Sequence, residues 1–348
     1  MEGKTKSCTI RDVARYCKVG VSTVSRAIND DPEIAPATRE RVLEAVRELH
    51  YVPNNSARNL KMTESRTVAL LVRGIDNYFY QGMYDPIQKD LREAGYDYII
   101  HAVDEVADVT KEASALVKEK RLCGLIILGG RVDKSARELS SIDIPYVLCT
   151  VAVPYGKAMP ECTTVGIDDE RSAFCITDYL IKKGHSRIAL LGGKKGDSAV
   201  GARRLEGYKR ACNEAGQPID ESLIFYMHDD IPEFSVENGY AMMKEAISSG
   251  VDFSAVFVIS DLMAIGAYKA LFEAGIKIPY DVSVVGFDGI NLGKFLHPTL
   301  TTMCQPRPQM ADKAVSELVR MMKGDDHIRH NVFETELLTG ESVSTKTD

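Results

Sequence analysis

Short apolar runs alternate with amphipathic segments along the chain from Arg66 onward. Each run is rich in Val, Ile and Leu, as is typical of a strand buried on both faces. The amphipathic segments repeat apolar residues at helical spacing, and several end in a glycine that stops a helix. This alternation predicts an α/β fold with parallel sheets covered by helices. The expected strands are Thr67–Val72, Tyr96–Ala102, Gly124–Leu128, Pro145–Thr150, Thr163–Ile167, Arg187–Leu191, Ala255–Ile259 and Val282–Phe287. Because so many strands fit poorly in one sheet, we expect two subdomains.

The first 62 residues show a different pattern, with no strand candidate and three short helical stretches. Thr9 and Asp12 have the spacing of a capping box. A turn at 18–20 separates this first helix from a second over Val21–Ile28, and Pro36 opens a third. The residues expected to face inward are Ile10, Val13, Ala14, Cys17, Val42, Val46 and Leu49. A helix, a three-residue turn and a helix together form the outline of a helix-turn-helix.

The charge of the chain is divided between these two parts. All 348 residues carry a formal charge of −7, with 43 basic and 50 acidic residues. Residues 1–62 contain 11 basic and 8 acidic residues, a net of +3, so that the remainder carries −10. A small basic head on an acidic body indicates a polyanion-binding module joined to a module of another kind.

Several classes of protein lack their sequence signals here. No apolar run is long enough to span a membrane, and the polar N-terminal segment has no export signal, so we expect a cytoplasmic protein. The glycine-rich stretch at 192–198 lacks the order of a phosphate-binding loop, and neither G-x-S-x-G nor H-E-x-x-H occurs. His327 and His330 stand near Asp325 and Asp326, which we interpret as a solvated turn and not as a metal site. We therefore expect no enzyme, no metal and no cofactor.

Several short motifs occur in order along almost the whole chain. In the head they are Thr9–Ala14, Val21–Asn29, Thr38–Val42 and Tyr51–Leu60; in the body they are Asp76–Phe79, Val165–Asp169, Arg204–Tyr208, Asp261–Gly266, Val284–Asp288 and Pro298–Thr302. Together they closely resemble the LacI/GalR family of bacterial transcriptional regulators. The resemblance implies a helix-turn-helix head (1–53), a hinge helix and linker (54–65), and a core like the periplasmic sugar-binding proteins (66–348). The core would comprise an N-subdomain at about 66–162 and 304–326 and a C-subdomain at about 163–303 and 327–348.

The resemblance places the second helix of the head in the DNA major groove. Arg26 is the first choice for reading bases, because a guanidinium can form two hydrogen bonds with guanine. Its alternative is a surface arginine near Asp30. Val21 and Ser22 match positions that select the DNA sequence, although Val21 is also a core candidate. The expected phosphate contacts are Thr9, Thr23, Ser25, Asn29 and Thr38. The family usually has Gly-Val-Ser in the turn where this chain has Lys18-Val-Gly20, and Lys18 is a substitute phosphate contact.

The hinge is expected at Asn54–Lys61, where the family forms a helix as two protomers lie side by side on DNA. Leu60 would enter the minor groove and open a base step, flanked by polar and basic residues. The alternative is a flexible linker whose leucine packs on the core. The remaining DNA-contact candidates of this region are Tyr51, Asn54, Ala57, Arg58 and Lys61.

The resemblance also implies an effector site between the subdomains, at the carboxyl ends of the strands. The candidates are Asp76, Asn77, Phe79, Thr150, Arg204, Asp261 and Asp288. An arginine, carboxylates and an aromatic ring are suited to recognising a sugar. Structural alternatives exist: Asp261 and Asp288 as helix N-caps, Phe79 as core, and Arg204 in a salt bridge with Glu206. The chain departs from the family pattern at two positions of this site. The family commonly has Asn where this chain has Ser260, and many members have an acidic residue where this chain has Thr150.

These expectations combine into a repressor of carbohydrate-utilisation genes that binds a palindromic operator as a homodimer. A small sugar-like effector would control it by shifting its conformation. No heptad repeat follows Gly340, which favours a dimer over a tetramer. Alternatives within the family are a catabolite-control regulator with a phosphoprotein corepressor, and a regulator of a nucleobase-like ligand. A solute-binding protein and a sugar-modifying enzyme are alternatives from other classes, against which the absence of an export signal and of a catalytic motif count.

Overall fold

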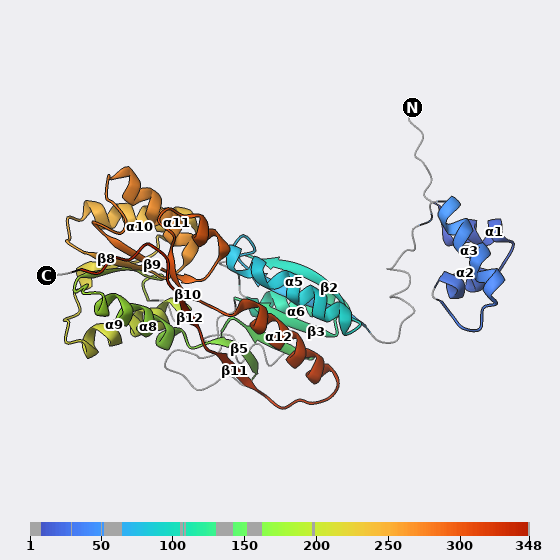
Figure 1. The fold of residues 1–348 in the computed structure, drawn as a ribbon. Coiled ribbons are helices and arrows are strands. Elements are labelled where there is room, and N and C mark those ends of the chain that lie inside the picture. The colour runs from blue at the N-terminus through green and yellow to red at the C-terminus, as the bar shows by residue number, and fades with distance from the viewer. Residues whose placement is uncertain are drawn as a thin grey trace. The chain divides into compact units, whose positions relative to one another are not determined.

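The computed structural model describes residues 8–28, 30–49, 51, 65–104, 107, 109–129, 142–151, 162–196 and 199–346. The chain divides into two compact units, Met1–Ser65 and Arg66–Asp348. The first takes in both the expected head (1–53) and the expected hinge and linker (54–65), and the second has the bounds expected for the core (66–348). Figure 1 shows the elements of each unit. No helix among the described residues is long and apolar enough to cross a membrane.

The head contains three helices in its described part: α1 (Ile10–Cys17), α2 (Val21–Ile28) and α3 (Pro36–Glu48). The start of α1 is fixed by Asp12, whose carboxylate accepts hydrogen bonds from the backbone N–H and the hydroxyl of Thr9, at 3.0 and 2.6 Å. Lys18 then turns the chain in the left-handed region, with φ of 52°. The helices bury a small common core of Val13, Ala14, Cys17, Val24, Ala27, Val42 and Ala45. The helix-turn-helix predicted from periodicity is confirmed.

The core consists of two six-stranded sheets. The first has the order β11-β5-β4-β3-β1-β2, and all its strand pairs are parallel. Its strands are β1 (Thr67–Arg73), β2 (Asp97–Val103), β3 (Gly124–Leu128), β4 (Tyr146–Cys149), β5 (Thr163–Ile167) and β11 (His330–Phe333). The helices of this subdomain include α5 (Tyr78–Glu93), α6 (Val109–Glu119) and α12 (Arg307–Met322). Strand β1 lies between β2 and β3 and is almost wholly apolar, because helices cover both faces of the sheet.

The second sheet has the order β12-β10-β9-β8-β6-β7, in which only β12 runs antiparallel to its neighbour. Its strands are β6 (Ile188–Leu191), β7 (Ile224–Phe225), β8 (Ala255–Val258), β9 (Ser283–Asp288), β10 (Thr301–Cys304) and β12 (Glu336–Leu338). Its helices are α8 (Asp169–Lys182), α9 (Val200–Glu214), α10 (Val236–Ser248) and α11 (Asp261–Glu273), with the short 3₁₀ helices η1 (Glu221–Leu223) and η2 (Asn291–Phe295). In Figure 1, α10 and α11 lie on one face of this sheet and α8 and α9 on the other.

The α/β fold is confirmed, but the expected boundaries of the subdomains are wrong in two places. Thr163–Ile167 was expected to open the second subdomain, whereas it pairs with β4 in the first sheet. Residues from 327 onward were expected in the second subdomain, whereas β11 pairs with β5 of the first. The chain therefore crosses between the subdomains after β5, between β10 and α12, and between β11 and β12. Strand patterns do not reveal this, because a buried strand looks alike in either sheet.

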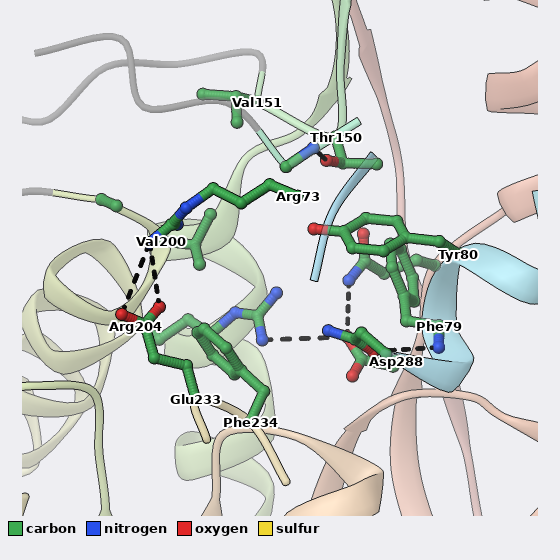
Figure 2. A pocket seen from close by; sticks show the side chains of 14 residues that line it. Arg73, Phe79, Tyr80, Thr150, Val151, Val200, Arg204, Glu233, Phe234 and Asp288 are labelled. Atoms are coloured by element: carbon green, nitrogen blue, oxygen red, sulfur yellow. Dashed lines mark hydrogen bonds and ion pairs between the residues drawn. The ribbon is translucent and has the colours of Figure 1, made fainter. Parts of the chain in front are cut away.

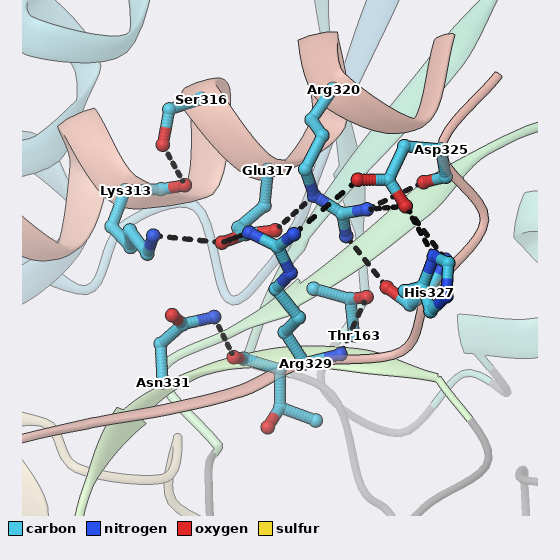
Figure 3. Close-up of polar contacts among 10 residues, drawn as sticks. Thr163, Lys313, Ser316, Glu317, Arg320, Asp325, His327, Arg329 and Asn331 are labelled. Carbon is cyan, nitrogen blue, oxygen red and sulfur yellow. Dashed lines mark hydrogen bonds and ion pairs between the residues drawn. The ribbon is translucent and has the colours of Figure 1, made fainter. Parts of the chain in front are cut away.

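A network of ionic contacts holds the return from α12 to β11 (Figure 3). Glu317, only 1% exposed, lies 2.8 Å from Lys313 and 2.7 Å from Arg320. Arg320 also pairs with Asp325 at 2.8 Å. The ring Nδ1–H of His327 donates to the carboxylate of this same aspartate at 2.7 Å. The turn interpreted from sequence as solvated is thus tied by internal ion pairs, and the described residues contain no cluster suited to a metal.

Candidate functional site

The outer face of α2 is the part of the head that is suited to contact DNA. Val21, Ser22 and Arg26 are exposed on it, while Val24 and Ala27 face the head's core. The exposure of Val21, 42%, excludes the core interpretation of this residue. The helix thus has one buried face and one face free to enter a groove, as a recognition helix requires.

The guanidinium of Arg26 is held by two acidic residues in the described head. Its Nε is 2.8 Å from Asp31, and its Nη2 contacts Glu33. Asp30, the neighbour expected from sequence, pairs instead with Arg39 at 2.9 Å. The hydrogen bond from Arg26 lowers the pKa of Asp31. Both Arg26 pairs lie at the surface, where ion pairs contribute little free energy, so that they orient the side chain without preventing an exchange for a base edge.

The other expected DNA contacts differ in their placement. Thr9 is exposed, whereas Thr23, Ser25, Thr38 and Tyr51 are half-buried. Tyr51 packs against the core of the head. Asn29, Asn54, Ala57, Arg58, Leu60 and Lys61, and with them the hinge, lie outside the described residues.

A pocket lies in the core, with walls from both subdomains (Figure 2). Five of the residues expected from sequence line it: Asn77, Phe79, Thr150, Arg204 and Asp288. The remaining lining residues were not expected: Arg73, Tyr80, Gly129, Val151, Ala199, Val200, Glu233, Phe234 and Gln305. Several of the lining residues stand at strand ends. Arg73 ends β1 and Asp288 ends β9, while Thr150 follows β4 and Gln305 follows β10. The pocket is therefore at the carboxyl ends of the strands, as predicted.

The wall from the first subdomain contains two aromatic rings, those of Phe79 and Tyr80. Asn77 caps α5 by accepting a hydrogen bond of 3.0 Å from the backbone N–H of Phe79. This cap fixes the start of the helix that carries Phe79 and Tyr80, whose rings meet edge to face at 5.5 Å. Phe79 is only 6% exposed and belongs to the hydrophobic core as well as to the pocket. Gly129 closes the wall, since a Cβ there would overlap the hydroxyl of Tyr80.

Arg204 is the central cation of the opposite wall. Its Nε donates to Asp169 at 2.9 Å, and its Nη1 donates to the backbone carbonyl of Ile259. The guanidinium also stacks on Phe287, 3.8 Å from the ring centre. The salt bridge with Glu206 considered from sequence is replaced by this one with Asp169. Burial raises the pKa of Asp169, and the positive charge of Arg204 opposes that rise.

Asp288 faces Arg204 across a longer gap of 3.8 Å. Its carboxylate accepts a hydrogen bond of 2.7 Å from the side-chain amide of Gln305. Its φ of 117° is outside the usual range for a residue other than glycine, and such strain often marks a functional site. Asp288 is the last residue of β9 and does not cap a helix, which excludes its structural alternative. Burial raises the pKa of this carboxyl, whereas Arg204 and Gln305 oppose the rise.

Two residues expected at the site do not line the pocket. Asp76 lies in the turn before α5, and its side chain is not part of the wall. Asp261 is fully buried and accepts hydrogen bonds from the hydroxyl of Thr302, at 2.7 Å, and the N–H of Ile290, at 2.8 Å. Asp261 therefore braces the segment behind Asp288. It stands inside the first turn of α11, where Ser260 is the N-cap residue.

Glu233 and Phe234 come to the pocket on the loop between β7 and α10. Asn238 fixes this loop: it is fully buried, and its amide donates to the carbonyls of His228 and Ile231 at 3.1 and 3.2 Å. Phe234 adopts the left-handed region, with φ of 53°. The sequence signal for this wall is weak, because β7 has only two residues and shows no strand pattern.

The fold and the site together define a ligand-binding core joined to a DNA-binding head. Residues 9–54 match the model of the bacterial regulatory proteins of the lacI family, and residues 177–343 match that of a periplasmic binding protein-like domain. A curated relative, the HTH-type transcriptional regulator MalR of Clostridium butyricum, is 36% identical over 335 residues, which cover 96% of this chain and 98% of the relative. The chain belongs to the lacI family of bacterial regulatory proteins.

Solved structures agree with this assignment. A transcriptional regulator CelR–cellobiose complex is 31% identical with a TM-score of 0.71, covering 96% of this chain and 99% of the other. The lac repressor dimer bound to operator and the anti-inducer ONPF is 25% identical with a TM-score of 0.81, covering 97% of this chain and 100% of the other. The chain is thus a DNA-binding transcriptional regulator of this family and not an enzyme.

Proposed function

We propose that this regulator is a repressor that binds a palindromic operator as a homodimer and responds to a small sugar-like effector in the core pocket. The observation that carries the proposal is the pocket itself, which draws residues from both subdomains. Phe79 and Phe234 offer apolar faces, while Arg204 and Asp288 offer hydrogen bonds to hydroxyl groups. Aromatic faces beside paired polar groups are suited to a sugar ring, whose faces are apolar and whose edge is polar.

The charges of the pocket favour an uncharged effector. Its two arginines, Arg73 and Arg204, each have carboxylate neighbours, so no cation of the wall stands alone among the described residues. An anionic ligand would have to compete with those carboxylates. The cellobiose named in the related CelR complex is a neutral sugar of this kind.

On the DNA side, Val21, Ser22 and Arg26 are proposed to read bases, and Leu60 to enter the minor groove. Thr9, Thr23, Ser25, Asn29, Thr38, Tyr51, Asn54, Ala57, Arg58 and Lys61 are proposed as the surrounding contacts. The net charge of +3 on residues 1–62 gives only modest electrostatic binding to DNA. Two heads and the two Leu60 side chains in the minor groove must therefore act together. Support for a dimer comes from the operator-bound dimer of the related lac repressor.

The test begins with selection of an operator from random duplex DNA by the full-length protein. Neutral sugars, sugar phosphates and nucleobases are then screened by thermal shift, and each hit is added to an operator-binding assay. We expect a palindromic selected sequence and a neutral sugar that changes operator affinity. If the protein selects no specific DNA sequence at moderate salt, the proposal that it is a repressor is wrong. If the ligand that binds is a nucleobase, the proposal of a sugar effector is wrong.

A further inference from the structure

Two charged side chains meet across the pocket, one from each subdomain (Figure 2). Arg73 is the last residue of β1, and Glu233 lies on the loop between β7 and α10. Nη2 of Arg73 is 3.4 Å from each carboxylate oxygen of Glu233. The two side chains are 13% and 14% exposed. The contact thus joins the opposite walls where little water surrounds it.

Glu233 has a second cationic neighbour, which belongs to its own subdomain. Lys194 follows β6, and its Nζ is 3.3 Å from Glu233 and 3.5 Å from Asp229. A motion of one subdomain against the other leaves this contact intact, because all three residues move together. The contact of Arg73 with Glu233, by contrast, exists only while the walls are close. Lys194 is therefore a matched control for Arg73.

The free energy of the cross-wall pair depends on its surroundings. Opposite charges attract more strongly where protein replaces water, although removing water from each ion costs free energy. Both side chains keep some solvent contact, so their desolvation is incomplete. Separating the walls would break the contact of Arg73 with Glu233 and expose both groups to more water, while Glu233 would keep its contact with Lys194.

We infer that Arg73 and Glu233 are positioning residues of the effector site, whose contact holds the two walls together before any ligand arrives. The equilibrium between open and closed pockets is then biased toward the closed form in the free protein. Neither side chain has to touch the effector for this role. The inference applies whichever ligand the pocket takes, so its failure is distinguishable from failure of the proposed sugar effector.

The test measures solvent access to the pocket by hydroxyl-radical footprinting of the full-length protein without ligand. Phe79 reports on the pocket, since it lines the wall and is 6% exposed. Phe257, which is fully buried in the second subdomain, is the internal reference. We expect Glu233→Gln and Arg73→Met each to speed oxidation of Phe79 about threefold relative to Phe257, because the open form becomes more populated. Lys194→Gln is expected to leave the ratio at the wild-type value.

Two further variants sharpen the result. The double variant Arg73→Met with Glu233→Gln is expected to match the single ones, because the contact is already lost in each. Arg73→Lys keeps the positive charge and is expected to restore most of the protection. The inference is overturned by an unchanged ratio in both single variants, by additive effects in the double variant, or by an equal rise with Lys194→Gln. A rise at Phe257 that equals the rise at Phe79 also overturns it, because the core as a whole is then loosened.

Discussion

Arg204 and Asp169 form an ion pair of 2.9 Å in which each side chain is only 6% exposed. The pair joins the beginning of α8 to α9, and it holds the guanidinium against the pocket wall. Arg204 therefore has two tasks, since it neutralises a buried carboxylate and presents hydrogen-bond donors at the candidate effector site.

Replacing Arg204 tests the structural task. Arg204→Met leaves Asp169 buried without its cation, and we expect the free energy of unfolding to fall by about 3–5 kcal/mol. Denaturant titration measures this change. The control is Arg171→Met, which removes an exposed pair with Glu334 and should cost less than about 1 kcal/mol. Equal losses of unfolding free energy in the two variants would show that the buried pair stabilises the fold no more than the exposed pair does.

Asp261 predicts a pH dependence of stability. Burial, with the nearby charge of Asp288, raises the pKa of this carboxyl from 3.8 to about 8. The folded state then holds the proton more tightly than the unfolded state, so stability from this group is fully present below about pH 4 and is lost as the pH rises toward 8. The denaturant midpoint of unfolding should therefore fall less steeply between about pH 4 and 8 in Asp261→Asn than in the wild-type protein. Asp97→Asn, which removes an exposed carboxyl, should keep the wild-type slope, and the same slope in Asp261→Asn would contradict the prediction.

Helices α10 and α11 touch through glycine. A Cβ on Gly266 of α11 would overlap the carbonyl oxygen of Val236 in α10 and lie 2.5 Å from the backbone nitrogen of Tyr240. Because backbone has little freedom to move, we expect Gly266→Ala to lower the melting temperature, with a loss of about 1–3 kcal/mol. A Cβ on Gly192 meets nothing closer than 3.5 Å, so Gly192→Ala is the control and should cost much less. A wild-type melting temperature in Gly266→Ala would mean that the helices separate easily.

Arg26 is the test of base recognition. Arg26→Met should weaken binding to the selected operator by about 10–100-fold, the effect of losing a bidentate contact with guanine, and should relax the preference at one base pair. Fluorescence anisotropy at fixed salt measures the affinity for the selected operator and for operators changed at one base pair. Arg15→Met is the control, since Arg15 is 79% exposed and pairs with Asp12 outside α2. If the two variants lose equal affinity on every DNA sequence, Arg26 contributes charge and does not read bases.

The local elements and much of the chemistry of this protein follow from its amino-acid sequence alone. The spacing of apolar residues predicted the three helices of the head and eight core strands, because periodicity is a property of neighbouring residues. The family motifs predicted Asn77, Phe79, Arg204 and Asp288 as effector-site residues, and the structure brings them to one pocket.

The sheet that each strand joins and the side chains that meet depend on tertiary packing. Thr163–Ile167 belongs to the first sheet, and Asp261 turns away from the pocket toward Thr302. Arg73 and Glu233, 160 positions apart in the chain, come together across the pocket. These relationships arise from the packing of segments distant in sequence, and a local pattern holds no information about a partner that far away.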